Sequence, residues 1–529
     1  MNLEPKYPYT DYGNGQRFGF LFEGELMFIP EINKWYEYDN NIWKQIRIDR
    51  VHRLYQVMLD SIPQEIDLLS NEFVERHSVA ISEERFLELR AGEEPKTPLE
   101  ITYVELLKQM KTALKWMHRS QDNPRINAAL DKGKSFGLMV DYKELDSKGY
   151  YLGTPTGIVN LRTKQIHNQD PSYLVTKSTK FNYNKDAECP IWTDYLLKMM
   201  KGDQEKADFL QRLFGQCLIG EPIKSHLVFF YGMGANGKST IVDTVAEILN
   251  DYATSMKADV LTGSAGYSVD YHIAKLKGQR LALINEMNKN SGAIDAMVKS
   301  LVDSGEIVAR QPYGEVFQFQ PIATPIVNVN HLPPLEGTDE GIQRRILLVP
   351  FEYTIPKNER QSDYRKAVLM KEAEGILNWC IEGAYQLIQD KFDLKPPTSI
   401  QAYTETYLSE QDRIASFMDE YLVEDQSVRI LWSEVYNSYR FWCEEAGMRS
   451  LGKIKCRQEF NSKGVVIQQG SPDNTNYVHG YNYRNKDVRG IKTVLRTDTR
   501  ESIAAQCIDY DEPATNVVKF KESELVKDT

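Results

Sequence analysis

Residues 226–240 read His226-Leu-Val-Phe-Phe-Tyr-Gly-Met-Gly-Ala-Asn-Gly-Lys-Ser-Thr240, an apolar run followed at once by a glycine-rich segment. From Gly232 to Ser239 the spacing is Gly-x-x-x-x-Gly-Lys-Ser, the phosphate-binding loop pattern. Glycine tolerates positive φ and close approach, so the backbone N–H groups of such a loop can surround a phosphate. With a strand before it and an amphipathic helix after it, the pattern predicts a nucleoside triphosphate site.

Each polar position of the loop has a chemical reason. Lys238 brings a positive charge to the β- and γ-phosphates, and Ser239 offers its hydroxyl to Mg²⁺. The following helix, over 240–249, turns its positive N-terminus toward the anion. We therefore expect ATP and Mg²⁺ as cofactors. The residues expected to hold the nucleotide are Gly232, Met233, Gly234, Ala235, Asn236, Gly237, Lys238, Ser239 and Thr240.

Composition narrows the class of protein. The 529 residues, 41% apolar and 26% charged, suit about three or four globular domains. A net charge of −11 argues that any DNA contact is confined to a local basic patch. The six cysteines are far apart and form no Cys-x-x-Cys, which argues against a disulfide framework or a zinc site. No stretch approaches the roughly 18 apolar residues of a membrane span, so we expect a cytoplasmic protein without a membrane partner.

Changes of pattern along the chain predict its divisions. Residues 17–46 are aromatic and broken by glycine, proline and an Asn-Asn pair, which predicts small hairpins. Helical periodicity follows from about residue 48. The expected divisions are a β-rich segment (1–47), a helical and mixed collar region (48–220), an ATPase core (221–390), a winged-helix-like domain (400–485) and a polar tail (486–529).

Four short apolar runs define the predicted core. They lie at 227–231, 280–285, 325–330 and 346–351, between amphipathic helices. Nearly continuous apolar strands alternating with helices are typical of a parallel sheet covered on both faces. The fold class predicted for the core is therefore α/β.

Polar residues at the ends of these runs are candidates for catalysis. Glu286 follows one strand, where an ATPase needs a carboxylate near Mg²⁺ and the attacking water. Asn285 precedes it and leaves open which residue holds the metal. Asn330 ends the next strand and suits either contact with the γ-phosphate or a turn before Pro333. Arg344 and Arg345 precede the last strand, as charge-neutralising groups or as surface cations.

Lys238, Glu286, Asn330 and Arg345 follow one another in an order and at a spacing that resemble the motifs of helicase superfamily 3. Further segments, among them Thr10-Asp-Tyr-Gly-Asn14 and Leu210-Gln-Arg-Leu-Phe-Gly215, look like the poxvirus-type amino-terminal region of the phage and plasmid primase-helicase family. The similarity runs from about residue 10 to about residue 480. It implies a P-loop, AAA+-like superfamily 3 core that assembles as a hexameric ring, with ATP between subunits.

The resemblance also implies a hairpin that enters the ring channel and holds single-stranded DNA. By position this hairpin covers 306–317, where Arg310 could contact a phosphate and Tyr313 could stack on a base. The alternative places Arg310 at the ATP interface and Tyr313 in hairpin packing. Lys299 stands at the position of a family lysine, and a solvated surface lysine is the other interpretation.

Several relatives in this family carry a primase or polymerase domain before the helicase, and we expect none here, which leaves a separate primase or polymerase as a further partner. In 400–485, three helices and a hairpin predict a winged helix. Lys453, Lys455 and Arg457 then lie on a DNA-facing helix, a solvated basic face or a protein-docking surface.

The leading functional prediction is an ATP-dependent DNA helicase for replication of a phage, plasmid or mobile element. Its substrates would be single-stranded and forked DNA, in the cytoplasm of a bacterial host. The alternative is an ATP-switched origin-binding or assembly factor that recruits other replication proteins.

Overall fold

The computed structural model describes thirteen stretches of the chain, and its contacts divide the chain into two compact units, Met1–Thr404 and Glu405–Thr529. The described residues are 7–168, 170–223, 225–262, 271–285, 297–303, 305–310, 316–333, 335, 341, 344–448, 450–470, 475–484 and 493–495. Among them, every helix is too short or too polar to cross a bilayer.

The first unit begins with a helix where the sequence predicts only hairpins. Helix α1 (Asp11–Leu21) is capped by Thr10, whose hydroxyl accepts a hydrogen bond from the Gly13 N–H at 3.0 Å. A Cβ at Gly15 would lie 2.8 Å from Lys132 Cβ, so glycine lets α1 pack closely on α5 (Asn123–Lys134). The hairpin prediction is therefore wrong for residues 17–21. It holds for the three-stranded sheet β1 (Leu26–Ile29), β2 (Lys34–Asp39) and β3 (Ile42–Ile46).

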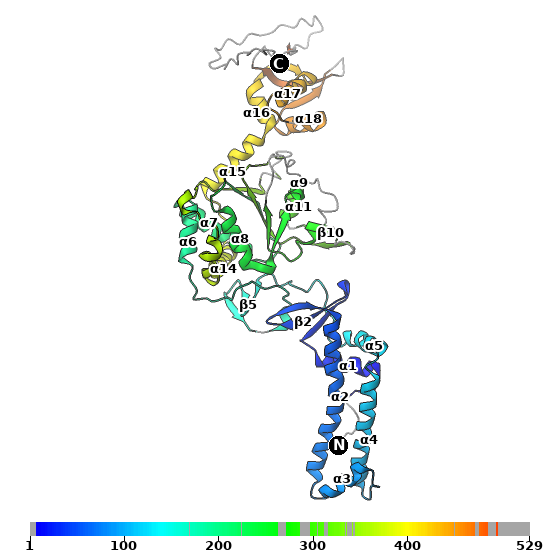
Figure 1. Ribbon diagram of the computed structural model, residues 1–529. Helices are drawn as coiled ribbons and strands as arrows, with labels where there is room; N and C mark the ends of the chain where they lie inside the picture. Colours follow the sequence, from blue (N-terminus) through cyan, green and yellow to red (C-terminus); the bar gives the residue numbers. More distant parts are fainter. Residues whose placement is uncertain are drawn as a thin grey trace, which may run out of the picture. The chain divides into compact units, whose positions relative to one another are not determined.

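The long helices that follow are joined to α1 by one buried amide. Helices α2 (Ile48–His77) and α4 (Pro98–Arg119) run side by side, with α3 (Glu83–Ala91) between them in sequence (Figure 1). Asn14 on α1 donates to Tyr55 on α2 and to Ser120 after α4, and it accepts from Trp116 on α4. Asn14, which belongs to the first of the family-like motifs, thus links α1 to α2 and α4.

A small sheet and two helices lead into the core. The sheet consists of β4 (Tyr151–Thr154), β5 (Gly157–Asn160) and β6 (Gln165–His167). The helices are α6 (Pro190–Met199) and α7 (Gln204–Gln216). Arg280, buried in the core, donates to the carbonyls of Tyr151 and Leu218 and so ties this region to the core sheet.

The core is a five-stranded parallel sheet in the order β13-β7-β12-β9-β8. The α/β prediction with a parallel sheet is confirmed, and each of the four predicted runs coincides with a strand to within one residue at either end. Figure 1 shows α8 and α14 on one side of the sheet and α9 and α11 on the other. The strands are β7 (Leu227–Tyr231), β8 (Ala253–Lys257), β9 (Leu281–Asn285), β12 (Thr324–Val329) and β13 (Ile346–Pro350). The helices are α8 (Lys238–Leu249), α9 (Asp259–Thr262), α11 (Met297–Val302), α13 (Tyr364–Ala367) and α14 (Ala373–Gln389).

A separate hairpin projects from the core between β9 and β12 in sequence. Strands β10 (Ile307–Arg310) and β11 (Val316–Phe319) pair antiparallel, with Arg310 opposite Val316. The hairpin lies where the sequence predicts one. Its turn, with Tyr313, lies outside the described residues.

The second unit contains α16 (Arg413–Tyr421), α17 (Trp432–Glu445) and α18 (Lys453–Ser462) around a sheet. Helix α15 (Thr398–Gln411) spans the division between the units. The three helices and the β15–β16 hairpin match the prediction, whereas β14 is an additional strand and β17 lies within the segment predicted as a polar tail. The strand order is β15 (Val466–Gln469), β16 (Asn476–Tyr483), β14 (Leu422–Leu431) and β17 (Thr493–Leu495). Side chains from all three helices share one core, including Phe417, Tyr439 and Phe460.

Candidate nucleotide-binding site

The glycine-rich loop follows β7, which lies between β13 and β12 in the sheet, and turns directly into α8. Gly234, Ala235 and Gly237 have φ values of 108°, 51° and 77°, the left-handed region that glycine adopts without strain. A Cβ at Gly232 would lie 2.0 Å from Asn236 Nδ2 and 2.6 Å from the Phe351 carbonyl oxygen. Packing therefore requires glycine at the start of the loop, and backbone conformation favours it at the end.

Lys238 is the first residue of α8 and is only 5% exposed. Its ammonium group donates to the Gly232 carbonyl, to Asn236 Oδ1 at 3.1 Å and to Asn330 Oδ1 at 3.2 Å. Burial lowers the pKa of Lys238 to about 8. The structure thus brings together two of the predicted site residues, Lys238 and Asn330, which are 92 positions apart.

Contacts from the end of β13 fix the loop from its other side. Asn236 Nδ2 donates to the Phe351 carbonyl at 3.2 Å, and the Ile355 N–H donates to the Ala235 carbonyl at 2.8 Å. The loop is therefore held by both neighbours of β7 in the sheet, because Gly232 N also donates to Val329 at the end of β12, at 3.3 Å.

A cavity of about 490 Å³ opens over the loop at the carboxyl ends of the strands. Three amides from β9, β12 and the residue after β12 line it, and Asn328 Nδ2 donates to Asn285 Oδ1 at 2.9 Å. Asn328 Oδ1 is buried and has no hydrogen-bond partner among the described residues. The lining consists of Gly234, Ala235, Asn236, Gly237, Lys238, Ser239, Thr240, Asp243, Asn285, Asn328 and Asn330.

The oxygen atoms of this cavity suit a small hard cation. The Ser239 hydroxyl and the amide oxygens of Asn285 and Asn328 are ligands of the kind that Mg²⁺ accepts, alongside water and phosphate oxygens. Asp243 adds a carboxyl that the sequence reasoning missed, and burial raises its pKa. Glu286, the predicted acid, follows β9 and lies outside the described residues.

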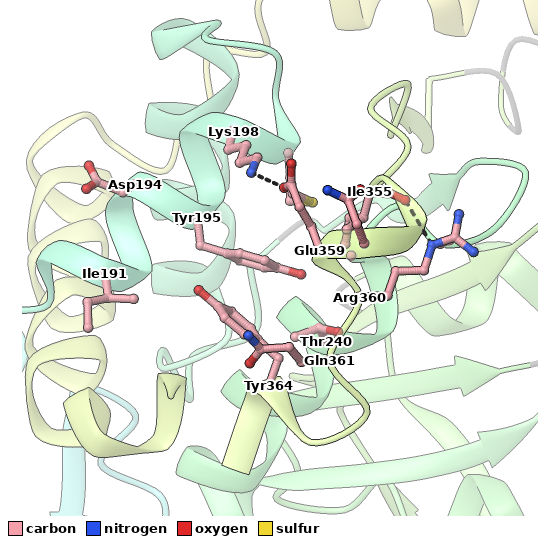
Figure 2. Close-up of a pocket in the computed structure, with 14 residues that line it drawn as sticks. Ile191, Asp194, Tyr195, Lys198, Thr240, Ile355, Glu359, Arg360, Gln361 and Tyr364 are labelled. Carbon is pink, nitrogen blue, oxygen red and sulfur yellow. Dashed lines mark hydrogen bonds and ion pairs between the residues drawn. The ribbon is translucent and has the colours of Figure 1, made fainter. Parts of the chain in front are cut away.

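A second cavity, of about 670 Å³, adjoins the first and shares Ala235, Gly237 and Thr240 with it. Figure 2 shows Tyr195 of α6 and Tyr364 of α13 at its wall. The sequence reasoning missed these residues. They precede and follow the loop by many positions, and only the fold brings them beside it.

The two candidate arginines differ in their surroundings. Arg345 forms an ion pair with Asp303, with Nε and Nη2 each 2.8 Å from a carboxylate oxygen, and it also donates to the Gly341 carbonyl. Arg344 is exposed. Neither is among the described residues that line the cavity over the loop.

The candidate DNA contacts lie on separate elements. Arg310 is exposed at the end of β10. Lys299 belongs to α11, and its side chain lies outside the described residues.

Three cationic candidates lie on α18 in the second unit. Lys453 and Lys455 are exposed, and Arg457 is half-buried and donates to the Ile467 carbonyl at 3.0 Å. Lys463, a further cation of this segment, is paired with Asp412. Pairing of Lys463 and anchoring of Arg457 leave a smaller basic surface than the sequence indicates.

Three family models match successive parts of the chain. The model described as D5 N terminal like matches residues 15–201, a family of unknown function matches 230–345, and the model described as Poxvirus D5 protein-like matches 409–496.

Several viral proteins are similar to the chain in sequence. A protein of Acanthamoeba polyphaga mimivirus that is named as a helicase is 23% identical over 429 residues, which is 77% of this chain and 43% of that protein. An African swine fever virus protein named as a primase is 24% identical over 365 residues, covering 64% of this chain and 38% of its own length. Primase D5 of fowlpox virus is 22% identical over 262 residues, covering 47% of this chain and 33% of its own length. The chain thus spans less than half the length of these relatives.

Among solved structures, an apo form of the C-terminal region of NrS-1 covers 90% of this chain and all of that chain, at 11% identity and a TM-score of 0.45. Such a score is too low to assign a shared fold.

The source of these relatives bears on the predicted host. They come from viruses of eukaryotes, so they give no support to a bacterial host. D5-type matches near both ends of the chain, together with these primase- and helicase-named relatives, make the chain similar to proteins of the poxvirus-type primase-helicase family.

Proposed function

We propose that this chain is an ATP-dependent DNA helicase that works in replication. The observation that carries the proposal is the buried Lys238 at the head of α8, held among loop oxygens and 3.2 Å from Asn330. A lysine in this position meets the β- and γ-phosphates of a triphosphate, which offsets the cost of its burial. The helicase and primase names of the viral relatives support the choice of substrate, DNA.

In this proposal, groups at the loop and at the ends of β9 and β12 each take one step. Lys238 and the N–H groups at the start of α8 bind the β- and γ-phosphates. Asn330, at the end of β12, orients the attacking water or contacts the γ-phosphate, and Glu286 accepts the proton of that water. Ser239 and Glu286 would hold Mg²⁺, which when bound would supply positive charge that stabilises the phosphate being transferred.

A ring of six subunits completes the site in this proposal. Because the Arg345 guanidinium is engaged by Asp303 within its own chain, we assign the trans-acting role to the exposed Arg344. Arg345 then positions the turn from which Arg344 projects. A guanidinium supplied across a subunit interface stabilises charge on the phosphate being transferred.

DNA contact belongs, in the same proposal, to the β10–β11 hairpin and to the second unit. Arg310 and Tyr313 would hold single-stranded DNA by a phosphate contact and by stacking, both independent of base sequence. In the second unit, the order helix, strand, two helices and hairpin is that of a winged helix. Its α18 would present Lys453 and Lys455 to the DNA backbone.

Replacement of the loop lysine tests this proposal. The Lys238→Ala protein should lose ATP hydrolysis and displacement of a strand from a forked duplex, each by about a hundredfold or more, because a preorganised charge at the γ-phosphate is removed. Lys111→Ala, at an exposed position of α4, is the matched control and should behave as wild type. Strand displacement by Lys238→Ala at the wild-type rate would contradict the proposal.

One observation favours a second candidate, an ATP-switched assembly factor. Asn285 stands where many ATPases of this kind have a second acid, and its amide is engaged by Asn328. A site with fewer acids suits a slow switch more than a fast motor. Steady ATP hydrolysis by wild-type protein without displacement of a strand from forked DNA would favour this candidate over the helicase.

A further inference from the structure

The larger of the two cavities beside the loop is separate from the residues that would hold the γ-phosphate and the metal. It lies between α6, which precedes the sheet in sequence, and residues 355–364, which follow its last strand (Figure 2). Its volume of about 670 Å³ is within the range of small-molecule sites. Lys238, Ser239 and Asn330, the groups expected at the triphosphate end, do not line it.

The two cavities are continuous along one line of loop residues. Ala235, Gly237 and Thr240 line both of them. Tyr195 and Thr240 both line the larger cavity, and a Cβ at Gly237 would lie 2.7 Å from the Tyr195 hydroxyl. A molecule whose phosphates follow the loop from the smaller cavity would therefore bring its other end against Tyr195.

The wall of the larger cavity is aromatic. The rings of Tyr195 and Tyr364 have centroids 5.2 Å apart and planes inclined by 31°. Rings at this separation touch, so a third ring cannot enter between them and must lie against the wall that they form together. A purine has a larger π-face than a pyrimidine, so it gains more from stacking against this aromatic wall.

Polar groups stand around the aromatic wall. Asn358 and Gln361 offer both donors and acceptors to the edge of a base. Lys198 and Glu359 form an ion pair of 2.6 Å between α6 and the turn after the sheet, and so join the two sides of the cavity. At the start of α6, the backbone N–H groups of Ile191 and Trp192 donate to Glu372, which fixes that helix from the same later segment. The cavity is thus held on both sides in the single chain.

We propose that this cavity binds the purine base of the nucleotide whose phosphates occupy the loop, with the base against Tyr195 and Tyr364. The inference deepens the proposed function and rests on its nucleotide site. It adds a base-binding site built from segments that precede and follow the core sheet in sequence, and it names the residues that would contact the base.

Comparison of a nucleotide with its phosphate chain alone tests the base site. Calorimetric titrations of the full chain with Mg²⁺ would use ATP, GTP, CTP and inorganic tripolyphosphate. Wild type should bind ATP and GTP at least about tenfold more tightly than tripolyphosphate, because stacking on an aromatic wall adds affinity. CTP should bind more weakly than either purine nucleotide.

Two variants separate base binding from loss of structure. Tyr364→Ala should weaken ATP binding by about tenfold or more and leave the affinity for tripolyphosphate unchanged, since the loop is intact. Tyr271→Ala, an exposed tyrosine that does not line the cavity, should change neither.

Each of the remaining outcomes would refute a particular part of the proposal. Equal affinity of wild type for ATP and tripolyphosphate, or a Tyr364→Ala protein that binds ATP like wild type, would refute the base site while leaving the phosphate site standing. CTP binding as tight as ATP binding would refute the purine assignment. Failure of wild type to bind either ATP or tripolyphosphate would remove the nucleotide site itself, and with it this inference.

Discussion

The side chain of Lys238 concentrates the chemistry of the site. It is buried among three oxygen acceptors, none of them a carboxylate, so its charge is solvated by dipoles alone. Burial lowers its pKa to about 8, from an ordinary value of about 10.4 for lysine. The ammonium group would therefore interact more strongly with an anion than with these neutral oxygen atoms.

This pKa predicts a pH dependence of ATP binding. Above about pH 8 the free protein holds Lys238 increasingly neutral, whereas bound phosphates favour the charged form, so binding must take up a proton. The dissociation constant for ATP should therefore rise about tenfold between pH 7 and pH 9. Calorimetry in buffers of different ionisation enthalpy would measure the proton uptake. A flat profile, or the same slope in Lys238→Ala, would contradict the assignment.

At the residue scale, the sequence predicts site residues that stand at a fixed spacing within one motif. It misses site residues that are far apart in sequence and meet only in the fold. The loop pattern identifies Lys238 and Ser239 because their spacing is fixed by a local turn. The sequence leaves Arg344 and Arg345 equivalent, because the Asp303 that engages Arg345 lies 42 positions earlier. Tyr195 and Tyr364 carry no local signal, since isolated tyrosines occur throughout the chain.

At the element scale, burial made the core strands predictable. The strands β7, β9, β12 and β13 are nearly continuous apolar runs because parallel strands are covered on both faces. The sequence pattern did not predict helix α1. Gly19 is a breaker in the sequence pattern, whereas in the fold Gly15 and Gly19 allow close packing against α5 and the residue Phe136 that follows it.

The β10–β11 hairpin supplies a prediction that separates the two interpretations of Arg310. If the hairpin holds DNA, Arg310→Ala should weaken binding of single-stranded DNA several-fold and reduce its salt dependence, because one phosphate contact is lost. ATP hydrolysis without DNA should stay near the wild-type rate. Fluorescence anisotropy at several salt concentrations and a phosphate-release assay would measure both.

Gln318→Ala, an exposed position on β11, is the control for that experiment. Loss of DNA-independent hydrolysis in Arg310→Ala, with DNA binding unchanged, would instead place Arg310 at the ATP interface.

At the scale of the whole molecule, the chain has two units with different tasks in this account. The first unit carries the sheet, the loop and both cavities, and the second carries the exposed lysines of α18. A single chain provides the phosphate loop but places neither Arg344 nor Arg345 at the described lining of the cavity above it. The central claim is therefore that the ATPase site is complete only between subunits.

Mixing two inactive variants tests this claim most directly. Lys238→Ala keeps Arg344 for a neighbour, and Arg344→Ala keeps its own loop, so each protein alone should hydrolyse almost no ATP. In equal mixtures that exchange subunits, about one interface in four pairs an intact loop with an intact arginine, and hydrolysis should recover toward about a quarter of the wild-type rate. An Arg344→Ala protein that hydrolyses ATP at the wild-type rate, or a mixture that stays inactive although native mass spectrometry shows mixed rings, would contradict the account.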